Sequence, residues 1–298
     1  MATPYAAVMS NFGDTRALAH LSDLHIGRSQ ANDERARGLC RALLEHAVDH
    51  VVVTGDLTHR GRTTEWTTFR DIFAPFLRNH RMTLVPGNHD RLGDDVAGEI
   101  MPGERVQVET APGLYLVRVN STGPHNRSWL HGHGLLTLED IHAVDAALTK
   151  APAHCMVVLL LHHHPSPLPD DRTVERLSSL MGWRFTSELD AGGLLLDRVR
   201  HRCDLVLHGH RHKPAARIVH DDPRPVRMFN AGSSTELAKG CLFTHSNGHM
   251  SAPLSWLSIS EPTSGPSSRS PARSRGNRPG ISGVENELSS LLGHQLAL

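Results

Sequence analysis

Five short polar clusters contain the residue types through which this sequence can bind metal ions. They combine carboxylate, amide and imidazole side chains. The clusters are Asp23-Leu24-His25, Gly55-Asp56, Gly87-Asn88-His89-Asp90, His162-His163-His164-Pro165 and Gly209-His210-Arg211-His212. Oxygen and nitrogen donors of these kinds suit divalent manganese, iron, cobalt or zinc, whereas copper(I) prefers thiolate or thioether sulfur. The clusters therefore predict a metal site without choosing among those metals.

The number of donors indicates two metal ions that share a ligand. About seven side chains are available, which is too many for one tetrahedral zinc ion, and a carboxylate can bridge two ions through its two oxygens. In an extended segment, residues two apart point to the same side. Asp23 and His25 are therefore expected to bind as one pair, and His210 and His212 as another.

The segments between the clusters alternate short apolar runs with longer amphipathic stretches, which predicts an α/β domain. The expected strands are Ala17 to Leu21, Val51 to Thr54, Met82 to Val85, Leu114 to Val119, Met156 to Leu161 and Asp204 to Leu207. The expected helices are Asp33 to Val48, Thr64 to Leu77, Leu138 to Leu148 and Ser187 to Arg200. Each polar cluster follows one of these strands. Because strand carboxyl ends converge at one edge of an α/β sheet, residues far apart in the sequence are expected to meet there.

The chain changes character after the last cluster. Short strand-like pieces follow, and Asn247-Gly248 is a strong hairpin-turn dipeptide, so antiparallel strands are expected to close the domain. Those pieces are Ala216 to Val219, Arg227 to Asn230 and Gly240 to Thr244. From about Glu261 the sequence is rich in serine, proline and arginine. We predict one domain over residues 1–258 and a flexible tail over 259–298, whose last stretch, Val284 to Leu298, is a frayed terminus or a short amphipathic helix.

In this order the clusters resemble the signature of the calcineurin-like metallophosphoesterase superfamily, over roughly Ala17 to Phe243. The resemblance implies a four-layer α/β/β/α sandwich with mixed sheets and an active site at the strand carboxyl ends. The ligands it implies are Asp23, His25 and His212 for the first metal, Asn88, His163 and His210 for the second, and Asp56 as the bridge. His163 is chosen by the family's H-x-P spacing, with His162 and His164 as the alternatives.

The resemblance also implies the chemistry. His89 would contact the phosphate and protonate the leaving oxygen, Asp90 would orient its imidazole, and a metal-bridging hydroxide would attack without a covalent intermediate. The family's closing Asn-x-Gly-Ser turn is present at Asn230-Ala231-Gly232-Ser233.

Four further residues near the clusters are less specific. Arg28 and His59 lie just beyond two clusters and are candidates for binding the substrate phosphate, although solvated surface positions explain them equally well. His131 and His133 stand in a glycine-rich loop where the family's pattern has no ligands. We therefore expect both to be loop residues near the cleft and not a chelating pair.

Hydrolysis of a small phosphodiester, such as a cyclic nucleotide, is the expected function, because the chain has little beyond the catalytic core. One alternative is a nuclease similar to the repair exonucleases, which Ser22 to Gly27 also resemble. Another is hydrolysis of a nucleotide-linked lipid precursor, for which Leu168 to Phe185 would supply an apolar pocket. A scaffold that has lost its metals is disfavoured, since no ligand is missing.

Bulk composition restricts partners and location. Lysine plus arginine and aspartate plus glutamate both number 31, so no chain-wide positive field favours a stable nucleic-acid partner. Residues 1–13 lack the pattern of an export signal, and the longest apolar run, Cys155 to Leu161, is too short to span a bilayer. The four cysteines have no C-x-x-C spacing and are predicted to be buried, reduced thiols. These features predict a cytoplasmic protein.

Overall fold

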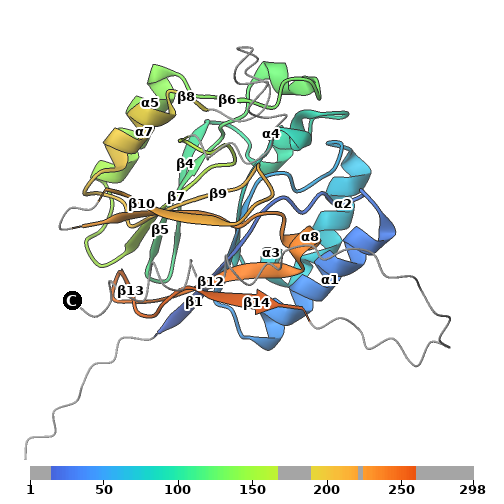
Figure 1. Cartoon of the computed structure of the whole chain (residues 1–298), viewed down its shortest axis with the longest axis horizontal. Helices are drawn as coiled ribbons and strands as arrows, with labels where there is room; N and C mark the ends of the chain where they lie inside the picture. Colours follow the sequence, from blue (N-terminus) through green and yellow to red (C-terminus); the bar gives the residue numbers. More distant parts are fainter. Residues whose placement is uncertain (1–14, 167–188, 221–223, 260–298) are drawn as a thin grey trace, which may run out of the picture.

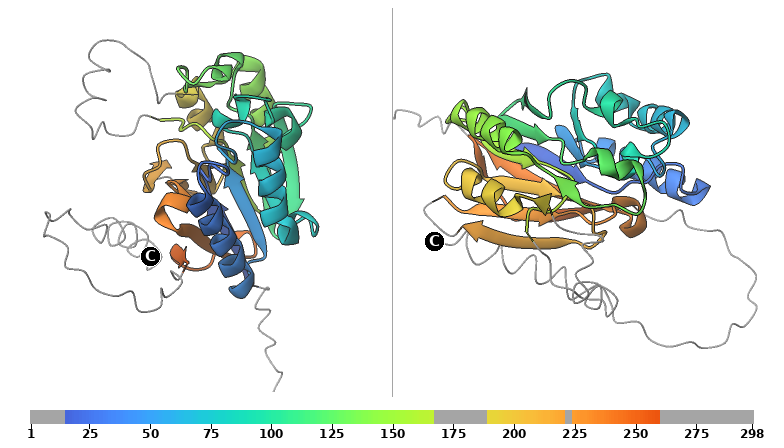
Figure 2. Two further views of the ribbon diagram at one scale, coloured as in Figure 1. Left: turned by 90° about the vertical axis from the view of Figure 1, so that its right-hand side faces the viewer. Right: turned by 90° about the horizontal axis from the view of Figure 1, so that it is seen from above.

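The computed structural model describes residues 15–166, 189–220 and 224–259. Two six-stranded sheets lie face to face in this part of the chain, and helices cover both outer faces (Figures 1 and 2). The predicted four-layer α/β/β/α sandwich is confirmed. The predicted tail over 259–298, including Val284 to Leu298, lies outside the described residues except for Ile259, and so does the segment Leu168 to Phe185.

The first sheet contains the strands that precede three of the polar clusters. Its order is β13-β12-β1-β2-β3, with β14 also paired to β12. The strands are β1 (Arg16–Leu21), β2 (His50–Thr54), β3 (Met82–Val85), β12 (Lys239–Ser246), β13 (His249–Met250) and β14 (Ser255–Ser258). β1, β2 and β3 are parallel, so their carboxyl ends meet at one edge, and β12 runs antiparallel to β1.

The second sheet contains the strands that precede the other two clusters. Its order is β10-β11-β9-β7-β5-β4, with antiparallel strands at both edges. The strands are β4 (Val106–Ala111), β5 (Leu114–Val119), β7 (Met156–Leu160), β9 (Leu205–His208), β10 (Ala215–His220) and β11 (Val226–Asn230). β4 is not among the predicted strands, because its side chains are half-buried or exposed and give no apolar run. A small parallel pair is formed by β6 (Gly134–Leu135) and β8 (Leu189–Asp190).

Helices cover each sheet on its outer side. α1 (Gln30–Glu45), α2 (Thr63–Ile72) and α3 (Ala74–Leu77) pack on the first sheet, and α5 (Leu138–Thr149) and α7 (Gly192–Val199) on the second. The predicted helix from Thr64 to Leu77 is divided at Phe73, because Pro75 follows and disfavours a continuous helix. The predicted helix from Ser187 is observed only from Gly192, since β8 precedes it. Short helices occur at α4 (Ala97–Ile100) and α8 (Ser234–Leu237), and 3₁₀ turns at His89–Arg91 and Pro124–Arg127.

Strand periodicity divides the apolar side chains among three core layers. In β2, Val52 points into the core between the sheets, whereas Val51 and Val53 point into the core beneath α1 and α2. In β7, Val158 faces the same inner core, and its neighbours face α5 and α7. Because both faces of these strands are buried, their sequences are apolar at successive positions.

Two further predictions are confirmed. Asn247 and Gly248, with φ of 50° and 79°, form the turn that joins β12 to β13. All four cysteines are buried and unpaired. Among the described residues, no helix combines the length and apolar character needed to cross a membrane.

Acidification is expected to destabilise the fold through His20 and His50. Burial lowers the pKa of His20 to about 3 and that of His50 to about 4, from 6.5. Between pH 6.5 and about 4 the unfolded chain therefore binds more protons than the folded chain. The free energy of unfolding consequently decreases as the pH is lowered through this range. Each unit of pKa difference corresponds to at most about 1.4 kcal/mol.

The test is urea unfolding at pH 7 and pH 5 in the presence of a chelator, so that metal release does not contribute. His50→Gln removes one of the two groups, and its amide can still bond to Thr83, the present partner of the His50 ring. The variant should lose less free energy of unfolding on acidification than the wild type. An equal loss in both proteins would contradict this role for His50.

Candidate metal centre

Tight turns at the strand ends aim the predicted ligands at one another. The φ angles of Asp23, His25, Asp56, His210 and His212 are 53°, 47°, 50°, 80° and 55°. All five lie in the left-handed region, which few residues other than glycine adopt without strain. The expectation that each pair would share one side of an extended strand end was therefore wrong. The pairs converge because the chain turns sharply at each ligand.

Backbone hydrogen bonds hold these turns. The Asp23 N–H donates to the Gly55 carbonyl at 3.1 Å, and the His25 N–H to the Asp56 carbonyl at 2.9 Å. The His210 N–H donates to the Asp23 carboxylate at 3.1 Å. Each strained turn is thus bonded to a neighbouring cluster, so the surrounding structure maintains its conformation.

The first set of donors comprises Asp23, His25, Asp56 and His212. The Nε2 atoms of His25 and His212 lie 2.9 Å apart. His212 Nε2 is 3.5 Å from Asp23 Oδ1, and His25 Nε2 is 3.8 Å from Asp56 Oδ2. This set matches the ligands that the family resemblance implies for the first metal together with the bridge.

The second set of donors surrounds the other oxygen of Asp56. His162 Nε2 lies 3.5 Å from Asp56 Oδ1 and 3.0 Å from Asn88 Oδ1. His210 Nδ1 lies 3.0 Å from Asn88 Oδ1 and 3.2 Å from His162 Nε2. Asp56 therefore directs one oxygen to each set, as a bridging carboxylate would.

The structure differs from the prediction in its choice within the histidine triplet. His163 lies near His162 and His210, but its ring is already occupied by bonds to the protein. Its Nε2 donates to the Gly132 carbonyl at 3.0 Å, and its Nδ1 lies 2.9 Å from Ser121 Oγ. His164 is buried, and its ring centroid lies 6.1 Å from that of the His210 ring. His162 is thus the triplet member whose nitrogen faces Asp56 and Asn88, because sequence spacing does not determine how each ring rotates.

The donor spacing in both sets fits divalent ions. Ligand atoms about 2.0–2.2 Å from one ion, at angles between octahedral and tetrahedral, lie about 2.8–3.6 Å apart. The distances above run from 2.9 to 3.8 Å, and all except that between His25 and Asp56 lie within this range. Carboxylate, amide oxygen and imidazole together suit manganese, iron, cobalt or zinc and do not choose among them.

Buried charge also favours cations at this position. Asp23 and Asp56 are almost completely buried. Burial and the neighbouring Asp56 charge raise the pKa of Asp23 well above its ordinary value. Burial alone would raise the pKa of Asp56 too, but the surrounding histidines, led by His162 and His89, lower it. Two divalent ions would supply the positive charge that these adjacent carboxylates lack.

Two glycines allow the ligand loops to approach closely. A Cβ at Gly209 would lie 1.8 Å from Ser22 Oγ and 2.5 Å from Asp23 Oδ2. A Cβ at Gly87 would lie 2.2 Å from Asp56 Oδ1. The glycines before His210 and Asn88 are therefore required for the packing of the centre.

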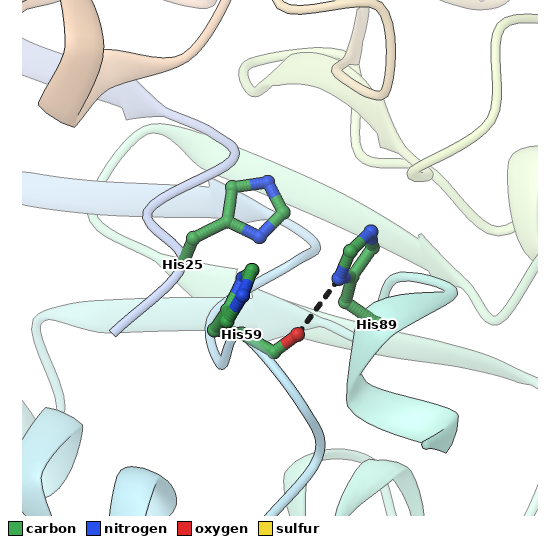
Figure 3. Close-up of side chains that lie close together, drawn as sticks. All are labelled: His25, His59 and His89. Atoms are coloured by element: carbon green, nitrogen blue, oxygen red, sulfur yellow. Dashed lines mark hydrogen bonds between the residues drawn. The ribbon is translucent and has the colours of Figure 1, made fainter. Parts of the chain in front are cut away.

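His89 lies beside the centre, next to His25 and His59 (Figure 3). Its Nδ1 donates to the His59 carbonyl at 2.8 Å, and its Nε2 is 4.0 Å from Asp56 Oδ2. The predicted role of Asp90 differs from the observed one. Its carboxylate accepts hydrogen bonds from Thr58 and from the N–H of Gly87, and a backbone carbonyl orients His89 instead.

A carboxylate outside the predicted site, that of Glu236, contacts His212. Glu236 Oε2 lies 3.5 Å from His212 Nδ1, and its other oxygen accepts a hydrogen bond from Arg28. The predicted closing turn brings α8 to this position, and Ser233 Oγ donates to the Asp23 carbonyl at 2.8 Å. Carboxylates bonded to a metal-ligating histidine fix its orientation, so Glu236 and Arg28 are placed to orient His212.

The glycine-rich loop lies near the cleft, as predicted. His133 stacks on His125 at 3.9 Å between ring centroids, and His131 is exposed. A Cβ at Gly132 would be 3.6 Å from the His210 ring. This loop therefore covers the second donor set without adding to it.

Comparisons with known proteins give a consistent result. The family model for calcineurin-like phosphoesterase matches residues 17–214. A probable cyclic nucleotide phosphodiesterase of Vesicomyosocius okutanii subsp. Calyptogena okutanii (strain HA) is 23% identical over 216 residues, covering 70% of this chain and 83% of that protein. A cAMP/cGMP dual specificity phosphodiesterase of Mycobacterium tuberculosis (strain CDC 1551 / Oshkosh) is 27% identical over 175 residues, covering 53% of this chain and 52% of that protein.

Solved structures share the fold at low sequence identity. A dimetal phosphatase from Danio rerio superposes with a TM-score of 0.54 and 11% identity, covering 82% of this chain and 99% of that one. A purple acid phosphatase from yellow lupin superposes with a TM-score of 0.52 and 11% identity, covering 80% of this chain and 53% of that one. At this identity the likeness concerns the fold alone.

The choice between His162 and His163 can be tested by metal content. We expect His162→Ala to bind one of its two manganese ions at least about tenfold more weakly, because a ligand is lost. His163→Ala should retain both ions, since its nitrogens bond to Ser121 and Gly132. Manganese bound per chain is measured after dialysis by elemental analysis. Selective loss of an ion in His163→Ala would contradict the geometric assignment.

Proposed function

Because this chain belongs to the calcineurin-like phosphoesterase family and is therefore a metal-dependent hydrolase of phosphate esters, we propose that it cleaves small phosphodiesters. The position of Asp56, with one oxygen directed to each donor set and with His89 beside it, carries the proposal. Two sequence relatives are named as cyclic nucleotide phosphodiesterases, which supports cyclic nucleotides as candidate substrates.

The metal ligands in this proposal form two sets around one carboxylate. Asp23, His25 and His212 would hold the first ion, Asn88, His162 and His210 would hold the second, and Asp56 would contribute one oxygen to each. When bound, two divalent ions lower the pKa of a water molecule and neutralise charge on the phosphate. The protein supplies fixed donor positions at the strand ends.

His89 is placed to supply a proton to the leaving oxygen. Its Nδ1–H is engaged by the His59 carbonyl, which leaves Nε2 facing the centre. Burial lowers the pKa of His89, but the charge of Asp56, the His59 carbonyl and Asp90 outweigh burial and raise it. With Nε2 facing the centre, His89 is placed to act as a general acid.

Arg28 and His59 remain candidate contacts for substrate phosphate oxygens. Arg28 donates a hydrogen bond to Glu236, which in turn contacts His212 of the first donor set. The centroid of the His59 ring lies 5.8 Å from the ring centroids of both His25 and His89. Both side chains are partly exposed beside the centre, where they can reach a bound phosphate.

The proposed function predicts that Asp56→Ala and His89→Ala each lower manganese-dependent hydrolysis of bis(p-nitrophenyl) phosphate by at least about 100-fold. Release of p-nitrophenolate measures the rate. His249→Ala is the matched control, because His249 is exposed and pairs with Ser246 near the Arg16 end of β1, far from the Asp23 end. Wild-type activity in a folded Asp56→Ala protein would overturn the proposal.

A further inference from the structure

A cavity of about 510 Å³ opens beside the metal centre on the side of His89. Its walls are formed by residues from three segments, 59–62, 89–93 and 127–129. This volume lies within the range of about 300–1,000 Å³ that is typical of small-molecule sites. Because His89 is shared by the cavity and the centre, a phosphate ester at the metals would extend its leaving group into this space.

The cavity is positively charged. Arg60, Arg62 and Arg127 line it, and no described aspartate or glutamate does. Arg127 is partly neutralised by Asp95, with its guanidinium nitrogens 2.9 and 3.1 Å from one carboxylate oxygen. Within the described part of the chain, the Arg60 and Arg62 guanidinium groups have no carboxylate partner. They are the charges available to an anionic ligand.

A buried carboxylate fixes the loop that carries these two arginines. Glu65 Oε2 accepts hydrogen bonds from the backbone N–H of Arg60 at 2.7 Å and of Arg62 at 3.3 Å. Between them, Gly61 adopts φ of 62°, and a Cβ there would lie 2.3 Å from the Leu92 carbonyl. The backbone of the arginine loop is therefore held in place before a ligand binds, which lowers the ordering cost of binding.

An exposed aromatic ring borders the same space. Trp129 is 80% exposed, an unusual state for the largest apolar side chain, and it lies on the wall with Arg127. Aromatic side chains in such positions stack on nucleobases. The cavity thus combines guanidinium groups, which bind phosphate, with a ring face, which binds a planar base.

Building on the proposed function, we propose that this cavity selects phosphodiesters whose leaving group is a nucleotide with a second phosphate, as in a 5′-phosphorylated linear dinucleotide. In a cyclic mononucleotide the single phosphate must occupy the metal centre, which leaves Arg60 and Arg62 without an anion to bind. In a linear dinucleotide the first nucleoside carries a terminal phosphate into the cavity and its base reaches Trp129.

The reaction is a hydrolysis with water as the co-reactant. The water oxygen forms a bond to phosphorus, and the bond from phosphorus to the 3′ oxygen of the first nucleoside breaks. The 3′ oxygen takes a proton from His89 Nε2, and the water releases a proton to solvent. The products are two nucleoside 5′-phosphates.

The test compares pApA with ApA, which share the scissile linkage and differ only in the terminal phosphate. We expect kcat/KM for pApA to exceed that for ApA by about tenfold, which corresponds to about 1.4 kcal/mol. The double variant Arg60→Ala/Arg62→Ala should bring this ratio close to one. Arg70→Ala, an exposed arginine of α2 outside the cavity, should leave the ratio unchanged. Trp129→Ala should lower kcat/KM for both dinucleotides by about tenfold, since stacking is lost.

The outcomes separate this inference from the function on which it rests. Hydrolysis of bis(p-nitrophenyl) phosphate together with equal kcat/KM values for pApA and ApA overturns the inference and leaves the phosphodiesterase proposal standing. A preference for pApA that survives in the double variant also overturns it, because the arginines would not be its source. If no diester is hydrolysed, both proposals fail.

Discussion

The burial of two adjacent carboxylates at one edge of the sandwich is the constraint around which the rest of this structure is arranged. Asp23 and Asp56 are cut off from water, and like charges in a medium of low dielectric constant repel strongly. Histidines from both sheets surround the pair, and glycines remove the side chains that would keep the loops apart. The strained turns at the strand ends also serve this arrangement, because they bring donors from several segments to one point.

Much of this architecture follows from local patterns in the sequence. Runs such as Val51 to Thr54 are buried on both faces and therefore apolar, so they can be recognised as strands from the sequence. The polar residues that follow them can then be recognised as a candidate site. β4 lacked such a signal because it is an edge strand with partly exposed side chains. The predicted helix start at Leu138 is confirmed, and the Thr137 hydroxyl caps α5 there by accepting a hydrogen bond from the Asp140 N–H.

The details that sequence could not supply depend on tertiary contacts. His162 and His163 are identical side chains in adjacent positions, and only the placement of Ser121 and Gly132 decides which ring is already occupied. Asp90 stands next to His89 in the sequence, yet its carboxylate bonds to the loop after β2. Arg60 and Arg62 follow Asp56 closely in the sequence, so their position beside the centre could be expected. Trp129 lies on a loop whose course no local pattern predicts, so its place on the cavity wall could not.

The position of β1 within its sheet has a consequence for synthesis on the ribosome. β1 lies between β2 and β12, and Ser22 at its end bonds through its backbone to Ser234, 212 residues later in the chain. Until β12 has been translated, β1 is an exposed edge strand with unpaired backbone groups, which favours aggregation. Contacts of such high sequence separation form slowly. The first metal set, which requires both Asp23 and His212, can therefore be completed only late in translation.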